Sequence, residues 1–241
     1  MKIKLKLIAF LLMACFSLKA QMKLKGSWSN IVDGTSTVRI YTDGFFAVSI
    51  FSNEKFISTY GGSYSVAGSS ITEKVEFDTQ TPERIGTEIK NDFKIVNLSK
   101  LSDELIIGNR KNDTFKRLDD SSPGKLAGAW LITGRYTNGE MKKNIPGVRR
   151  TMKILSGTRF QWIAYNVETK EFFGTGGGTY TTENGKYTES IDFFSRDQTR
   201  VGMSLGFDFF IMDDGAWRHS GNSSKGEPID EVWTQREKLG M

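Results

Sequence analysis

The stretch that decides the fold is Leu24–Trp28, whose sequence is LKGSW. The chain repeats it 102 residues later as Leu126–Trp130, which reads LAGAW. A second pair of segments follows in the same order, because Gly61–Tyr64 (GGSY) corresponds to Gly177–Tyr180 (GGTY). Similarity that recurs in a fixed order indicates a duplicated domain rather than shared composition.

The spacing within the two units also agrees. Glu73 precedes Arg84 by 11 positions, and Glu189 precedes Arg200 by 11 positions. Each unit has roughly a hundred residues, which is long enough to bury a hydrophobic core without disulfides. We therefore expect four segments: a leader at 1–20, a first unit at 21–120, a linker at 121–125 and a second unit at 126–241.

The leader has the pattern of a secretory signal peptide. Lysines at positions 2, 4 and 6 precede an apolar run at 7–18, which is too short to span a membrane. We expect a secreted or periplasmic protein. An alternative is that Leu12–Cys15 (LMAC) acts as a bacterial lipobox, so that Cys15 carries lipid and the protein is an outer-membrane lipoprotein. Membrane attachment is expected only in that case.

Charge and composition narrow the possible functions. The whole chain has a net charge of +5, but four of its 33 basic residues lie in the leader, which leaves 29 against 28 acidic residues. A nearly neutral mature chain argues against nucleic acid as a partner. Cys15 is the only cysteine and His219 the only histidine, so thiolate or multi-histidine metal sites are excluded.

Short β-rich runs fill both units, and Gly, Asn, Asp and Ser separate them. Examples are Phe45–Phe51, Ser58–Val66 and Phe160–Tyr165, with turns such as Thr42–Gly44. About eight strands in a hundred residues indicate an antiparallel meander that closes into a barrel or folds as a sandwich. The predicted class is all-β.

A Gly-x-Trp motif in the first strand, with a basic residue just after the last strand, resembles the lipocalin (calycin) signature. The chain looks similar to the exported lipocalin-like domains of unknown function found in Bacteroidota. The resemblance implies two tandem antiparallel up-and-down β-barrels of about eight strands each. It also implies that each Trp closes one barrel end while a basic side chain packs across its ring. The matching residues are Gly26, Trp28 and Arg117 in the first unit, and Gly128, Trp130 and Arg236 in the second.

Two glutamate–arginine pairs are candidate sites. We expect Glu73 to face Arg84, and Glu189 to face Arg200, across a hairpin turn. Such a pair could bind a polar head group or could be a structural salt bridge at the barrel mouth. Each glutamate has a second acid three positions later in its strand, and the two point to opposite faces, which disfavours paired-carboxylate hydrolysis.

The second unit contains an insertion of twelve residues after its Trp, within residues 135–150. We expect this insertion to roof the second barrel, whose cavity should be the larger of the two. Its cations either attract an anionic ligand or are merely solvated. They are Lys142, Lys143, Arg149 and Arg150.

Aromatic residues alternate along two runs of the second unit, at Phe160 and Trp162 and at Phe207 and Phe209. Alternation in a strand points these rings to one face, where they fill a core or line a cavity. The glycine run 174–178 is followed by a strand rather than a helix, so we expect a bulge there and not a phosphate loop. His219 is expected to be a surface or capping residue.

No combination of nucleophile and base is visible, so an enzymatic function is not favoured. We expect an exported non-enzymatic binding protein for a small apolar or anionic amphiphilic ligand, with no cofactor and no metal. The alternatives are an accessory glycan-binding or glycan-processing protein, and a structural module with filled barrels. The candidate ligand-binding residues are Arg200, Glu189, Lys142, Lys143, Arg149, Arg150, Phe160, Trp162, Phe207 and Phe209.

Overall fold

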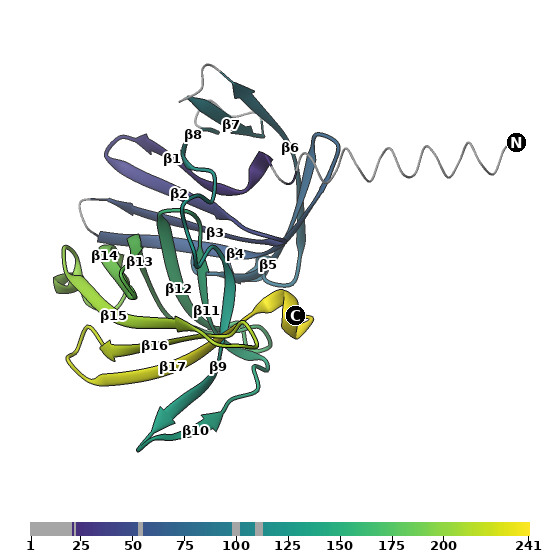
Figure 1. Cartoon of the computed structure of the whole chain (residues 1–241). Helices are drawn as coiled ribbons and strands as arrows, with labels where there is room; N and C mark the ends of the chain where they lie inside the picture. Colours follow the sequence, from purple (N-terminus) through teal and green to yellow (C-terminus); the bar gives the residue numbers. More distant parts are fainter. Residues whose placement is uncertain (1–20, 22, 53–54, 98–101, 109–112) are drawn as a thin grey trace, which may run out of the picture.

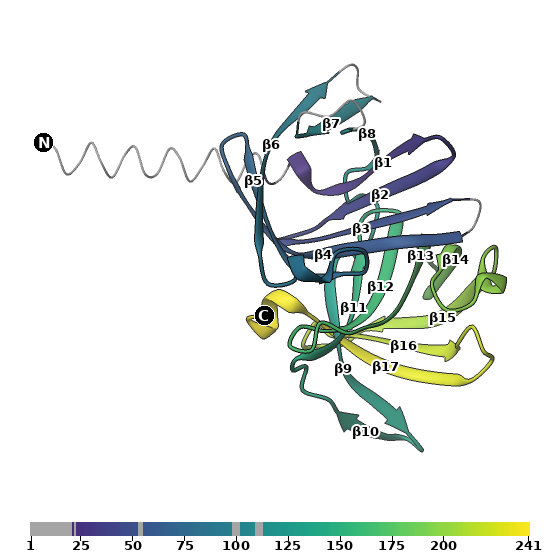
Figure 2. The ribbon, with the colours of Figure 1, turned by 180° about the vertical axis from the view of Figure 1, so that it is seen from behind.

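The computed structural model describes residues 21, 23–52, 55–97, 102–108 and 113–241. The predicted signal peptide and Cys15 lie outside these residues. The described chain forms two antiparallel β-barrels that pack side by side, as Figures 1 and 2 show from opposite directions. The all-β class and the two tandem barrels predicted from the repeat are confirmed.

The first barrel is an up-and-down meander in which each strand pairs with the next. Closure comes from β1, which pairs with β8 as well as with β2. A single short 3₁₀ turn, η1 (Pro82–Arg84), joins β5 to β6. The strands are β1 (Gly26–Val32), β2 (Thr35–Tyr41), β3 (Phe45–Ser52), β4 (Lys55–Ala67), β5 (Ser70–Asp78), β6 (Glu88–Asn97), β7 (Asp103–Ile107) and β8 (Thr114–Asp119).

The second barrel repeats this order and adds one strand. It closes through the pairing of β9 with β17, while β10 pairs only with β9 and lies outside the closed ring. Two 3₁₀ turns, η2 (Gln198–Arg200) and η3 (Arg236–Leu239), follow β14 and β17. The strands are β9 (Gly128–Thr137), β10 (Glu140–Lys143), β11 (Arg149–Leu155), β12 (Arg159–Asn166), β13 (Phe172–Glu183), β14 (Lys186–Phe194), β15 (Ser204–Ile211), β16 (Trp217–Asn222) and β17 (Pro228–Gln235).

Each Gly-x-Trp tryptophan seals the base of its barrel in the same way. The indole Nε1 of Trp28 donates to the carbonyl of Leu24, and that of Trp130 donates to the carbonyl of Leu126, both at 2.9 Å. Both rings are buried. The guanidinium of Arg117 lies 3.9 Å from the centroid of the Trp28 ring, as the family resemblance implies.

The matching expectation for Arg236 is wrong. The register places Gln235, not Arg236, opposite Trp130, so the next side chain points out of the barrel. Arg236 instead lies 4.1 Å from the centroid of the Phe45 ring in the first barrel and forms an ion pair with Glu76 at 2.9 Å. It therefore joins the two barrels.

Both barrels bend at a bulge in their fourth strand. The register shifts at Gly62 in β4 and at Gly178 in β13. A Cβ at either position would collide with the facing carbonyl oxygen, of Lys74 or of Ser190. The glycine run therefore provides a bulge, as the sequence predicts, and no phosphate loop.

The barrels face each other through equivalent strands. Phe77 of β5 packs on Tyr165 of β12, with ring centroids 4.9 Å apart, and Phe193 of β14 packs on Phe51 of β3, at 5.0 Å. Phe77 of the first repeat corresponds to Phe193 of the second, and Phe51 corresponds to Tyr165. Each contact therefore pairs the same two positions with the roles of the repeats reversed, as in the self-complementary interface of a two-fold dimer. A shared apolar cluster fills the space between them, with members from both barrels.

Asp119 fixes the junction between the barrels. Its carboxylate accepts hydrogen bonds from Ser27 in β1 (2.6 Å), from Ser156 (2.8 Å) and from both the backbone and the hydroxyl of Thr158. Burial opposes its ionisation, but these donors outweigh burial and lower the pKa of Asp119. The short connection between the repeats is thus tied to both of them.

Candidate functional site

A buried ion pair occupies equivalent positions in both barrels. Arg39 lies opposite Trp28 in the β1–β2 register, and Lys153 lies opposite Trp130 in the β9–β11 register. In the first barrel, Arg39 and Glu73 are 3.4 Å apart. The hydroxyl of Tyr41 donates to Glu73 at 2.9 Å, and burial, followed by the charge of Glu73, raises the pKa of Tyr41 well above its usual value. The hydroxyl therefore stays protonated.

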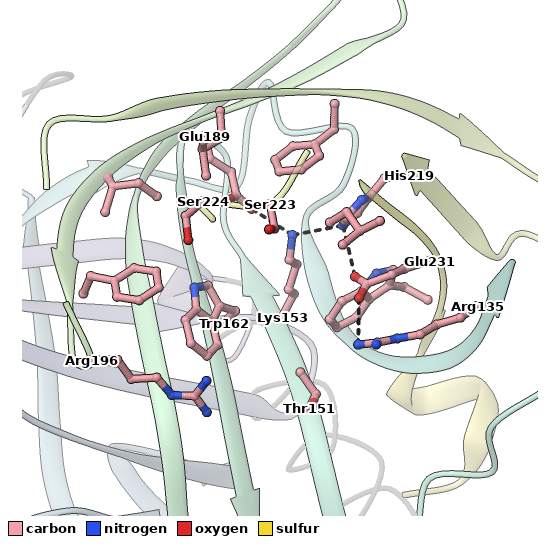
Figure 3. A pocket seen from close by; sticks show the side chains of 16 residues that line it. Arg135, Thr151, Lys153, Trp162, Glu189, Arg196, His219, Ser223, Ser224 and Glu231 are labelled. Carbon is pink, nitrogen blue, oxygen red and sulfur yellow. Dashed lines mark hydrogen bonds and ion pairs between the residues drawn. The ribbon is translucent and has the colours of Figure 1, made fainter. Parts of the chain in front are cut away.

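In the second barrel, the ammonium of Lys153 donates to Glu189 at 2.8 Å. The hydroxyl of Tyr187 donates to the same carboxylate at 2.7 Å, and burial raises the pKa of Tyr187 well above its usual value. Lys153 also approaches Nε2 of His219 at 3.2 Å. Figure 3 shows this network, in which Lys153 stands between Glu189 and His219.

Four aromatic rings surround the ammonium of Lys153. The distances from its nitrogen to the ring centroids are 5.0 Å for Tyr187, 5.3 Å for Trp217, 5.4 Å for Trp233 and 5.6 Å for Phe207. Cation–π attraction at such distances is strongest where the cation is desolvated, and Lys153 is buried. The base of the second barrel interior is thereby filled by this lysine and its ring partners.

His219 is not a surface residue, contrary to the sequence-based expectation. It is 1% exposed, and burial together with the nearby Lys153 charge lowers the pKa of His219 well below its usual value. The ring is therefore neutral, and because the ammonium can only donate, Nε2 accepts and Nδ1 carries the proton. Nδ1 has no hydrogen-bond partner among the described residues. Glu231 lies 3.7 Å beyond Nε2 and pairs with Arg135 at 3.0 Å.

A pocket of about 290 Å³ lies above this network and opens at the end of the barrel away from Trp130. Seven of its sixteen lining residues are aromatic or aliphatic, and the two arginines at its rim are Arg135 and Arg196. The guanidinium of Arg196 extends toward the Trp162 ring (Figure 3), 5.9 Å from its centroid. The main apolar wall residues are Trp162, Ile191, Phe194, Leu205, Phe207, Ile229 and Trp233.

The wall formed by Trp162 depends on a glycine in the adjacent strand. Gly176 of β13 lies opposite Trp162, and a Cβ at Gly176 would stand 2.7 Å from the indole nitrogen. The equivalent pair in the first barrel is Tyr60 opposite Val48. Tyr60 there accepts from Arg39 at 2.8 Å and fills the same space with a polar side chain.

The expectation that the second barrel has the larger cavity is wrong. A space of about 800 Å³ opens at the first barrel, lined mainly by polar and charged side chains such as Arg39, Arg84 and Lys90. The difference follows from side-chain volume, because three tryptophans occupy the second interior where the first has smaller residues. Trp162, Trp217 and Trp233 replace Val48, Leu105 and Phe115 in the register.

The expected glutamate–arginine pairs do not form. Arg84 pairs with Asp78 at 3.3 Å, and Arg200 pairs with Asp197 at 2.9 Å. Each arginine ends a 3₁₀ turn, η1 or η2, which carries it away from the strand that holds the glutamate. Arg200 also donates to the carbonyl of Ser224 at 2.6 Å, beside the pocket rim rather than inside it.

Of the remaining candidate residues, some line the pocket and others lie in the hydrophobic core around Trp130. Trp162 and Phe207 line the pocket, as predicted from the alternation of aromatics, and so does Glu189, which was predicted to point inward with Arg200. Phe160 lies in the core around Trp130, and Phe209 packs against that core. Neither of these two rings lines the pocket.

The insertion does not roof the pocket. Residues 140–143 form β10, which extends the sheet beside the barrel, and the hairpin projects from the barrel body in Figures 1 and 2. Lys142, Lys143 and Arg149 line a separate groove of about 710 Å³, which meets the pocket only at Arg135 and Thr151. Arg150 is turned toward the first barrel and pairs with Glu76 at 3.0 Å.

Five ionisable pocket residues were not among the candidates from the sequence: Lys153, His219, Glu231, Arg135 and Arg196. A signal for Lys153 existed, because both units place a cation before isoleucine at this register position, as Arg39-Ile40 and Lys153-Ile154. Nothing local marks the other four. The meeting of Arg135 with Glu231 depends on barrel closure, which brings β9 beside β17.

Comparisons with known proteins identify no family and no relative of this chain. No protein-family model matches the chain, and no curated protein matches it. Within the described ranges, no group of three or more His, Cys, Asp or Glu side chains is arranged to hold a metal ion. No helix in that part of the chain is long and apolar enough to cross a membrane.

Proposed function

We propose that this chain is an exported binding protein whose second barrel holds a small amphiphile with an anionic group. The lipocalin-like resemblance of both repeats and the leader motivate the exported binding protein. The observation that carries the ligand class is the pocket above Lys153: apolar walls with two arginines at the rim. Ligand sites in proteins are typically concave, mostly apolar and equipped with a few polar groups.

The pocket size limits the ligand to a small molecule. About 290 Å³ is at the lower end of the range of roughly 300–1,000 Å³ for ligand sites. The apolar part of the ligand would lie between Trp162, Leu205 and Phe207. Its anionic group would meet Arg135 and Arg196, since guanidinium groups provide several donors suited to a carboxylate or sulfonate.

The buried network supports a binding role for this barrel over catalysis. Lys153 is engaged by Glu189 and His219, and four rings enclose it, so its charge is already compensated without ligand. A neutral His219 adds no net charge at the pocket floor. At the rim, Arg135 already pairs with Glu231, whereas Arg196 has no acidic partner among the described residues. An anionic group is therefore attracted to the rim, chiefly to Arg196, rather than to the floor.

The test uses two fluorescent probes that share one aromatic skeleton. Anilinonaphthalene sulfonate carries an acid, and phenylnaphthylamine is its uncharged counterpart. We expect both to bind, with the sulfonate favoured, and the Arg135→Ser/Arg196→Ser variant to weaken the sulfonate about tenfold while leaving the neutral probe unchanged. The matched control is Arg84→Ser/Lys90→Ser, which removes two cations at the opening of the first barrel.

Native mass spectrometry of the purified chain, followed by solvent extraction, asks separately whether a ligand co-purifies. Equal loss of the sulfonate probe in the rim and control variants would contradict the proposed site. Loss of both probes together in the rim variant would show that the arginines support the fold rather than the ligand.

A further inference from the structure

The insertion carries a surface that the binding pocket does not use. Of the eight large apolar residues exposed in the described part of the chain, Met141, Ile145 and Val148 all belong to it. Ile145 is 91% exposed, more than any other of the eight. Single exposed apolar residues are ordinary, but here three occur within eight consecutive positions, and two of them, Ile145 and Val148, line one groove.

Cations alternate with these apolar side chains. Lys142, Lys143 and Arg149 are exposed and line the same groove as Ile145 and Val148. None of these three cations has an acidic partner within the described residues. At the edges of the insertion, in contrast, Arg135 pairs with Glu231 and Arg150 pairs with Glu76. The insertion thus carries an excess of positive charge, with Glu140 as the one acid between residues 136 and 149.

We propose that the insertion is a docking element for an anionic lipid surface. Apolar side chains that project between cations are suited to this partner, because the cations meet the head groups while the apolar tips enter the acyl boundary. A soluble polyanion would use the cations and leave Ile145 in water. The first repeat has only the tight turn between β1 and β2 at this place, so the surface is specific to the second barrel.

The groove of the insertion lies beside the proposed ligand pocket. The groove of the insertion meets the second-barrel pocket at Arg135 and Thr151. Docking through Ile145 would bring the pocket opening close to the lipid, from which an amphiphile could be taken or to which it could be delivered. The docking itself does not depend on the proposed ligand, and its test needs no ligand.

The test is sedimentation with sucrose-loaded vesicles of phosphatidylcholine containing phosphatidylglycerol, and of phosphatidylcholine alone. The chain from residue 21 is suitable, because both closed barrels lie within it and the apolar leader is removed. We expect binding to the anionic vesicles only. Lys142→Ser/Lys143→Ser/Arg149→Ser should weaken binding on the order of a hundredfold, and Ile145→Ser by about tenfold.

Two matched controls separate docking from general charge and hydrophobicity. Lys90→Ser/Lys94→Ser/Lys116→Ser removes three exposed cations of the first barrel, and Ile31→Ser removes another highly exposed isoleucine. Both should retain most of the binding. The proposal is overturned if the control triple loses as much as the insertion triple, or if the unaltered chain does not bind anionic vesicles. It is also overturned if Ile145→Ser has no effect, which would indicate a soluble polyanion instead.

Discussion

The two barrels bury equivalent ion pairs but surround them with different side chains. Both bury a carboxylate at the same position, on β5 or β14, and pair it with a cation that reaches it across the barrel interior from β2 or β11. The tyrosine that donates to the carboxylate comes from β2 in the first barrel, as Tyr41, and from β14 in the second, as Tyr187. The position of the charge is therefore retained between the repeats while the side chains around it are exchanged.

The exchange changes what lies above the ion pair. In the first barrel, Tyr60 binds Arg39 and Arg84 stacks 5.0 Å from the Tyr60 ring, which leaves a polar opening. In the second, Gly176 allows Trp162 to form an apolar wall instead. The two interiors thus differ at this position because a glycine in the second barrel accommodates an indole ring, where the first barrel has a tyrosine opposite a valine.

The largest effect is expected from the buried ion pairs. Lys153→Met should lower the free energy of unfolding by about 3–5 kcal/mol, because it leaves the Glu189 carboxylate buried without its cation, with only the Tyr187 hydroxyl as a donor. Arg39→Met should cost a similar amount in the first barrel, since Glu73 is equally buried. Urea titration followed by tryptophan fluorescence measures both.

The double variant Lys153→Met/Glu189→Gln is the control, and should recover more than half of the loss because no unpaired charge remains. A cost below about 1 kcal/mol for either single variant would break the equivalence of the two pairs.

His219 distinguishes the barrels by pH, since the equivalent position in the first barrel is Ile107. The folded pKa of His219 is depressed, so below the unfolded value of about 6.5 the unfolded chain binds a proton that the folded chain does not. Stability should therefore fall by about 1 kcal/mol between pH 6.5 and 5.5, and the slope should approach about 1.4 kcal/mol per pH unit below that range. Urea midpoints across this range measure the slope.

Because His219 is the only histidine, the slope can be assigned to one group. His219→Gln should remove the dependence in this range, whatever it does to stability at neutral pH. A slope that persists in the variant would mean that His219 is not the buried neutral residue described above.

The smallest effect concerns the barrel ends. Arg117→Gln gives the first barrel the residue that the second has at this register position, Gln235. It removes the stack on Trp28 and the hydrogen bond to the carbonyl of Lys25, at a cost of about 1–2 kcal/mol. Lys116→Gln, at an exposed neighbouring position, should change stability by less than about 0.5 kcal/mol.

Most of the fold could be predicted because its signals are local and occur twice. Gly-x-Trp, the turn residues and the alternating runs located most strands within a few residues. The strand β16 (Trp217–Asn222) was not predicted, because Arg218, His219 and Ser220 interrupt its apolar pattern. Of these, His219 is explained only by the barrel interior, where it meets Lys153, while Arg218 points to the other face of the strand and pairs with Asp230.

The site could be predicted only in part. Trp162, Glu189 and Phe207 were found because strand alternation assigns them a face, and a face is a local property. The pairing of Glu189 with Lys153 instead of Arg200 depends on two strands that are far apart in sequence. The prediction for Arg236 was off by one residue, because Gln235 occupies the register position opposite Trp130. A shift of one residue turns a side chain to the opposite face of the strand, here from the barrel base to the interface between the barrels.

The most direct test of the account exchanges the residues that open the second barrel for those of the first. Trp162→Val/Gly176→Tyr installs the Val48 and Tyr60 pair in the second barrel, and circular dichroism checks that the variant is folded. We predict that it no longer binds anilinonaphthalene sulfonate or phenylnaphthylamine, whereas Tyr60→Phe in the first barrel binds both as the unaltered chain does. A folded double variant that retains both probes would show that the second-barrel pocket is not the ligand site.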